Sequence, residues 1–238
     1  MANFDIAQGS PLPGTAADTD RVVSFLRAAY GWMCAGLAIT AVTAGFVASS
    51  PSLLRAIAQN QILYLGLFAA QLGIVFYLSS RVQHLAASTA SLLFIGYSVL
   101  TGVTLSFVML VYTGQTLTST FVVTAGMFGS MALYGTVAKR SLAGWGQFLF
   151  MGLIGVVIAS IVGIFWHSDG LQFVISFIGV IVFTGLAAYD AQRLKSMALM
   201  TTSGDIGSYA IVGALALYLD FVNLFLMLLR LQGGGRRR

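Results

Sequence analysis

The stretch ALALYLDFVNLFLMLLR, from Ala214 to Arg230, carries a single acidic residue, Asp220, in an otherwise almost wholly apolar run. A helix that spans a bilayer needs about 20 mostly apolar residues, and this run approaches that length. A charged side chain at the centre of a bilayer costs about 3 kcal/mol on insertion scales, and such residues are usually functional. The stretch therefore predicts a membrane helix that holds a paired or neutral acid.

The composition of the whole chain agrees with a membrane location. The 238 residues are 58% hydrophobic and 8% charged, with a mean hydropathy of +0.91. A soluble domain has about 25% charged residues, so this chain cannot cover itself with a polar surface. The net charge of +5 does not indicate a nucleic-acid partner, because the basic residues fall at the ends of apolar segments. We expect the lipid bilayer to be its surroundings.

We predict an all-α integral membrane protein with seven transmembrane helices in one domain, over residues 21–232. Short linkers require the helices to pack as antiparallel neighbours, and no open strand edge is tolerated at membrane depth. We expect a disordered cytoplasmic tail over residues 1–20, which lacks the pattern of a signal peptide, and a basic tail over residues 233–238. The predicted spans are Ala28–Ser50, Gln61–Ser80, Leu85–Val111, Leu117–Ala138, Trp145–Trp166, Leu171–Gln192 and Ser208–Leu231.

Small residues recur at four-residue spacing in two of these spans. Such spacing lets helix backbones approach closely where the hydrophobic effect gives no help. It predicts close packing at two sets of residues, one in the third span and one in the fifth: Ser98, Gly102 and Ser106, and Gly155, Ala159 and Gly163.

The distribution of basic residues predicts the orientation, because cytoplasmic loops are enriched in lysine and arginine. With the N-terminus in the cytoplasm, the outer loops carry only Arg55. The arginines at 236–238 then lie outside, against this bias, but the length and apolarity of the last span favour seven crossings. The residues on the inner side are Arg21, Arg27, Arg81, Lys139, Arg140, Arg193 and Lys195.

Two acids lie within apolar spans, in a chain with seven aspartates and no glutamate. Asp220 is in the seventh span, with Asn223 three residues on and so on nearly the same face. Asp190 is in FTGLAAYDAQRLKS, close to the predicted cytoplasmic end of the sixth span. Because these two helices are consecutive and antiparallel, we expect the acids to form a shared site.

Physical chemistry suggests what such a pair does. Burial disfavours the charged form of each carboxylate, and a neighbouring carboxylate disfavours a second charge. Two acids within hydrogen-bonding distance share a proton and titrate as a coupled unit. Oxygen ligands also suit calcium, a hard cation, so Asp190 and Asp220 are the candidate ligands for a transient calcium ion. The alternative is a hydrogen bond between helices with no transport role.

The segments GLAAYDAQRLKS and ALALYLDFVNLFLMLLR resemble the two signature segments of the Bax inhibitor-1 family, in particular its bacterial YccA-like branch. The resemblance extends over all seven spans and includes the GGGRRR tail. It implies a central last helix wrapped by two layers of three helices. It also implies that Asp190 and Asp220 form a pH sensor in a calcium leak linked to cell-death or stress control.

The resemblance further implies an arginine latch on the acid pair, at the cytoplasmic end of the second span. Arg81 fits that position. Tyr189 and Asn223, which adjoin the acids, are candidate supporting residues. Some members pair a late arginine of the last helix, here Arg230, with an acid in the second span. The span Gln61–Ser80 has no acid, so we expect Arg230 to extend to the membrane interface instead.

The acid pair and the family resemblance together imply two functions from different classes. The first is a pH-sensitive calcium leak channel of the inner membrane, gated by the aspartate pair, with calcium as the permeant ion and no cofactor. The second is a non-conducting membrane protein that modulates a membrane-anchored quality-control protease or a stress or cell-death pathway. We do not expect an enzyme. An intramembrane aspartyl protease would need glycines just before its second aspartate, whereas Asp220 follows Leu-Tyr-Leu.

Overall fold

The computed structural model describes residues 16–166, 168–200 and 206–233, and every regular element in these ranges is helical. Seven stretches are long and apolar enough to cross a membrane, as predicted: α1, α3, α4 with α5, α6, α7, α8 and α9. The helices are α1 (Ala16–Ala48), α2 (Pro51–Gln59), α3 (Gln61–Arg81), the 3₁₀ helix η1 (Val82–His84), α4 (Ala87–Leu105), α5 (Val108–Val111), α6 (Gly114–Val137), α7 (Ala143–Phe165), α8 (Asp169–Met200) and α9 (Ile206–Gly233).

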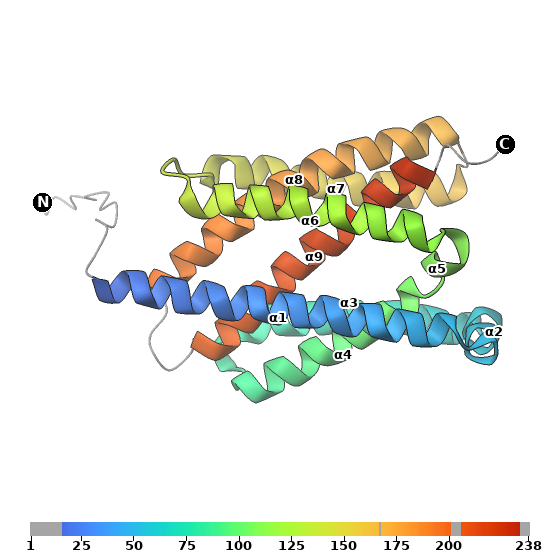
Figure 1. Ribbon diagram of the computed structural model, residues 1–238, viewed down its shortest axis with the longest axis horizontal. Coiled ribbons are helices and arrows are strands. Elements are labelled where there is room, and N and C mark those ends of the chain that lie inside the picture. The colour runs from blue at the N-terminus through green and yellow to red at the C-terminus, as the bar shows by residue number, and fades with distance from the viewer. Residues whose placement is uncertain (1–15, 167, 201–205, 234–238) are drawn as a thin grey trace, which may run out of the picture.

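The last helix, α9, lies at the centre of the bundle. It packs on α1, α4, α6 and α8, and makes a smaller contact with α3. Figure 1 shows it running obliquely between a group formed by α1, α3 and α4 and a group formed by α6, α7 and α8. Its side chains are accordingly among the most buried, including Leu217, Tyr218 and Leu224. α1 begins at one end of the bundle and α9 ends at the other (Figure 1), as expected for an odd number of crossings.

Several boundaries differ from the sequence prediction. α1 begins at Ala16, inside the predicted tail over residues 1–20. The part of that tail before Ala16, and the basic tail from residue 234 onward, lie outside the described residues. The short helix α2 was not predicted. Pro51 occupies its first turn, a position that suits proline because its missing N–H has no helical partner there, and α2 buries Leu54 and Ile57.

The prediction for the sixth span was wrong at its C-terminal end, because α8 ends at Met200 rather than at Gln192. Polar residues of its last turns bind the end of α6 and the segment that joins α6 to α7. The Gln192 amide donates to the Arg140 carbonyl (2.9 Å) and accepts from the Leu142 N–H (2.6 Å). The Lys195 ammonium donates to the Thr136 carbonyl (2.9 Å). A prediction from hydropathy ends the span at the first polar residues. In the structure, the hydrogen bonds of these polar residues stabilise a helix that continues beyond that point.

Close packing is confirmed in the third span, where Ser98, Gly102 and Ser106 are all buried. A Cβ atom at Gly102 would meet the Thr40 carbonyl and the Thr43 side chain of α1, so this glycine permits α1 and α4 to approach.

In the fifth span the packing prediction was wrong at Gly155, which is exposed and where an added Cβ atom would meet no neighbour within 4 Å. The prediction holds at Gly163, which is buried and where an added Cβ atom would meet Gln172 of α8. Two further close approaches of α7 to α8 lie at Gly146 and Gly152, against Tyr189 and Val182. Because α7 packs mainly on α8, only one of its faces is in contact. The small-residue spacing at Gly155 falls on another face.

At Gly135 of α6, an added Cβ would overlap the backbone of Ala188 in α8. Backbone atoms cannot rotate away, so we expect Gly135→Ala to force α6 from α8 and to destabilise the protein by about 1–3 kcal/mol, the usual cost of overpacking. Gly129→Ala is the matched control, because Gly129 lies on the same helix with no neighbour in reach. Thermal unfolding in detergent measures both; equal melting temperatures for the two variants would contradict the α6–α8 contact.

Candidate functional site

The structure brings the two predicted acids together. The side chains of Asp190 on α8 and Asp220 on α9 are hydrogen-bonded to each other. The two helices are antiparallel, with Gly213 against Leu194 on one side of the pair and Gly179 against Met227 on the other side. The approach of the two carboxyl groups that the sequence predicted is therefore confirmed, while their role remains a prediction.

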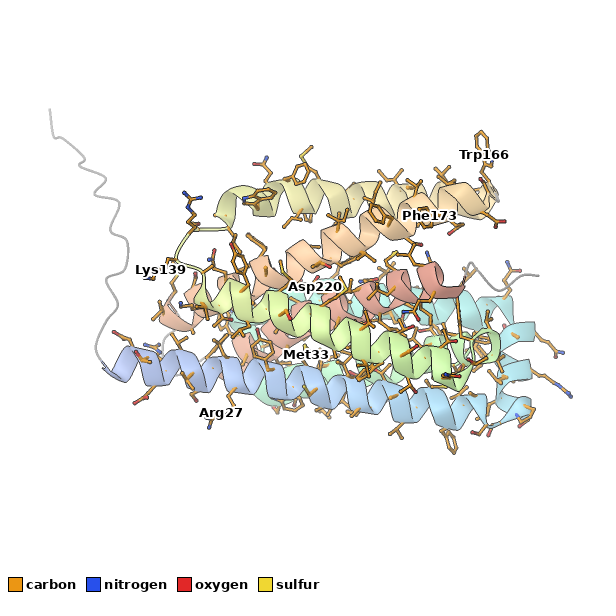
Figure 2. All side chains as sticks on the ribbon, turned by 45° about the horizontal axis from the view of Figure 1, so that its top comes forward. Arg27, Met33, Lys139, Trp166, Phe173 and Asp220 are labelled. Carbon is orange, nitrogen blue, oxygen red and sulfur yellow. The ribbon has the colours of Figure 1, made fainter. Side chains whose placement is uncertain are left out.

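The length of α8 explains how the acids meet. If α8 ended at Gln192 as predicted, Asp190 would lie too close to the membrane edge to reach Asp220. Because α8 continues to Met200, at a rise of about 1.5 Å per residue, Asp190 lies well inside the helix. Asp220 lies near the middle of α9, which starts at Ile206. Both carboxyl groups are therefore interior to the bundle, where Figure 2 shows Asp220.

The two carboxyl groups differ in their surroundings. Asp220 is 6% exposed, whereas Asp190 is half-buried. The Oδ2 atom of Asp220 is buried and has no hydrogen-bond partner in the part of the chain that the structure describes. On α8, Asp190 lies between Ala187 and Ala191, which are both fully buried. These small side chains leave room for the two carboxyl groups to approach, and an unpartnered oxygen remains to accept a donor or a cation.

The arginine whose charge acts on the acid pair is Arg193, not Arg81. Its positive charge acts on Asp190, one turn earlier on α8. Arg81 is exposed at the end of α3, and within the described ranges it forms no ion pair with either acid. The structure does not bring the predicted latch to the acids, and that role for Arg81 stays a prediction.

The two predicted supporting residues point elsewhere. The Asn223 amide donates to the Leu219 carbonyl of its own helix (2.8 Å). The Tyr189 ring packs over Gly146 of α7. Neither side chain bonds to the acid pair among the described contacts.

Sequence analysis missed a second buried polar cluster, on the α1 and α4 side of α9. The Tyr218 hydroxyl lies 2.6 Å from the Thr40 hydroxyl of α1 and also bonds to Thr101 of α4. Thr40 in turn donates to the Ser98 carbonyl (2.9 Å), and the Tyr97 ring packs edge-on against Tyr218 at 5.8 Å. A tyrosine and threonines at isolated positions of apolar spans give no sequence signal, because each is common as a packing residue.

Within the described residues there is no group of three or more His, Cys, Asp or Glu side chains that could hold a metal ion. Asp190 and Asp220 alone would supply carboxylate ligands. Calcium prefers six to eight oxygen ligands, so the pair suits a passing cation better than a tightly held one.

The fold and the site define a seven-helix membrane protein with a carboxylate pair between its last two helices. The sequence profile described as "Inhibitor of apoptosis-promoting Bax1" matches residues 22–237. The chain therefore belongs to the Bax inhibitor-1 family, as its signature segments suggested.

The relatives are bacterial and similar along nearly their whole length. The inner membrane protein YbhL of Escherichia coli K12 is 48% identical over 216 residues, covering 90% of this chain and 92% of YbhL. A protein of Deinococcus radiodurans is 43% identical over 213 residues, covering 89% and 91% of the two chains. A protein of Caulobacter vibrioides is 36% identical over 250 residues, covering 99% and 100%. These matches and the seven apolar helices support a multi-pass location in the inner membrane. Assignment to the YccA-like branch remains a prediction.

The hydroxyl cluster generates a prediction about stability. Tyr218→Phe removes one buried hydroxyl, and Thr40→Val leaves that of Tyr218 with fewer partners, so we expect each to destabilise the protein by about 1–3 kcal/mol. Because the two groups bond to each other, the double variant should cost clearly less than the sum of the single variants. Thermal unfolding of the four proteins measures the coupling. Additive effects would show that the two hydroxyl groups act independently.

Proposed function

We propose that the protein is a pH-sensitive calcium leak of the inner membrane, held closed by the hydrogen-bonded pair of Asp190 and Asp220. The observation that carries this proposal is the contact of two carboxyl groups within the membrane-spanning parts of α8 and α9. Ionisable groups at that depth are costly and commonly belong to ion or proton pathways. A purely structural contact would be made as well by an uncharged pair.

The chemistry of the pair links protons to helix contact. Charge is disfavoured on each buried carboxyl group, and two adjacent negative charges are disfavoured further. The closed contact is therefore stable while the pair keeps a shared proton. A change in its protonation alters the bond that joins α8 to α9, and α9 contacts both groups of helices. The pair can thus bias the packing of the whole bundle.

The same carboxyl groups offer oxygen ligands to a permeating cation. The buried Oδ2 of Asp220 has no partner within the described structure, and a carboxylate oxygen suits calcium. In this proposal, calcium occupies the site briefly when the two helices separate. Arg193 acts on the pair from the cytoplasmic side and stabilises negative charge at Asp190.

We expect Asp220→Asn to remove most of the pH dependence of calcium flux through the purified protein in liposomes that contain no other protein. Asparagine keeps the shape and a hydrogen-bonding group but cannot share a titrating proton. Adding Asp190→Asn should change the profile little further, because coupled residues are not additive. Asp169→Asn is the control, since Asp169 is exposed at the start of the same α8 helix.

An unaltered pH profile in Asp220→Asn, or additive effects in the double variant, would refute gating by the pair. If the native protein passes no calcium at any pH, the leak itself is refuted. That outcome would favour the non-conducting protein that modulates a membrane-anchored protease or a stress pathway.

A second prediction distinguishes the two arginines. Arg193→Gln removes a positive charge that favours ionisation of the pair, so the midpoint of the flux–pH curve should move to higher pH. Arg81→Gln should leave the midpoint in place, because Arg81 makes no described contact with the acids. The same liposome assay measures both. A shift confined to Arg81→Gln would restore Arg81 as the latch and contradict this assignment.

A further inference from the structure

An apolar cleft of about 330 Å³ opens beside α9, between α1, α5 and α6. Its volume falls in the range of about 300–1,000 Å³ that is usual for ligand pockets. The cleft is separate from the acid pair. The lining includes Ala41 and Ala44 of α1, Met109 of α5, Phe121 of α6, and Phe221 and Phe225 of α9.

The arrangement of the helices produces this cleft. α1 and α6 both pack on α9 but make little contact with each other among the described residues, and Figure 1 shows them on either side of it. The side-chain bond between Tyr30 and Thr136 links them only towards the cytoplasmic end. Farther out, the small side chains of Ala41 and Ala44 leave the space beside α9 unfilled.

In the orientation that the basic residues predict, the cleft lies in the outer half of the membrane, and it opens sideways. Ala44 is near the outer end of α1, which finishes at Ala48, and Phe121 follows the outer start of α6 at Gly114. At the rim Phe121 is 48% exposed, whereas Phe221 on the floor is 5% exposed. The opening of the cleft therefore faces the hydrocarbon of that leaflet, where the acyl chains of the lipids lie.

Only two of the lining side chains are polar, and both are already hydrogen-bonded within the protein. The Thr40 hydroxyl is bonded to the Ser98 carbonyl and Tyr218, and the Thr118 hydroxyl donates to the Gly114 carbonyl. A water molecule needs at least two polar partners, and apolar cavities stay dry. An unfilled cleft would forfeit dispersion contacts along its walls. We propose that this cleft binds one acyl chain of an outer-leaflet phospholipid. The proposal does not depend on ion conduction.

The test uses the full-length protein in phosphatidylcholine vesicles doped with a phosphatidylcholine that carries a diazirine in the middle of one acyl chain. After irradiation, adducts are mapped by peptide mass spectrometry. Bulk lipid labels exposed residues, so the informative position is buried Phe221 on the cleft floor. We expect its labelling to exceed that of Phe183 several-fold, because Phe183 is equally buried, at 4% exposure, but does not line the cleft.

A variant that fills the cleft provides the second part of the test. Ala41 is exposed at the rim, so Ala41→Phe should fold normally while occupying the cleft and should reduce Phe221 labelling several-fold. Ala38→Phe is the matched control, because Ala38 is also exposed on α1 and does not line the cleft. Thermal unfolding confirms that both variants are folded, and Ala41→Leu replaces Ala41→Phe if the larger side chain is not tolerated. Labelling of Phe221 no higher than that of Phe183, or unchanged by filling the cleft, would overturn the proposal.

Discussion

The cost of placing Asp220 inside the bilayer is the constraint on which the rest of the structure depends. A charged group at that depth costs about 3 kcal/mol, and α9 offers no partner of its own at this position. The partner is Asp190, which has to come from deep within α8. That requirement explains why α8 must extend well past Asp190. It also explains why polar residues near its end are bound to neighbouring backbone, Gln192 to the segment after α6 and Lys195 to the last turn of α6.

α9 can occupy the centre of the bundle because two of its polar side chains meet partners on opposite sides of the helix. Asp220 meets α8, while Tyr218 bonds to Thr40 of α1 and to Thr101 of α4. Two directional contacts at almost the same depth fix the rotation of the helix about its axis. Apolar side chains close to these two contacts on α9 are completely buried, among them Leu217 and Leu224. The acid pair and the hydroxyl cluster therefore join α9 to both groups of surrounding helices.

The spans and the acid pair could be predicted from sequence because each has a strong local signal. Hydropathy over about 20 residues marks a span, and an acid in an apolar run is conspicuous. The predictions that were wrong concern contacts that depend on which face of a helix packs against its neighbours. Gly155 follows the expected spacing but lies on an exposed face of α7, whereas Gly135, without such a pattern, meets the backbone of Ala188. Arg81 matched a position in the family, yet Arg193 on the same helix as Asp190 acts on the pair. The Tyr218 cluster joins three helices and has no local signal.

Isotope-edited infrared spectroscopy of the aspartate carboxyl groups, recorded against pH with the protein in lipid bilayers, tests the central claim most directly. Two carboxyl groups that share a proton titrate in two separated steps that belong to the pair. We expect two such steps in the native protein and, in Asp190→Asn, a single step for Asp220 at a different pH from either. Two overlapping steps in the native protein, with that of Asp220 unchanged when Asp190 is replaced, would show that the two carboxyl groups are independent.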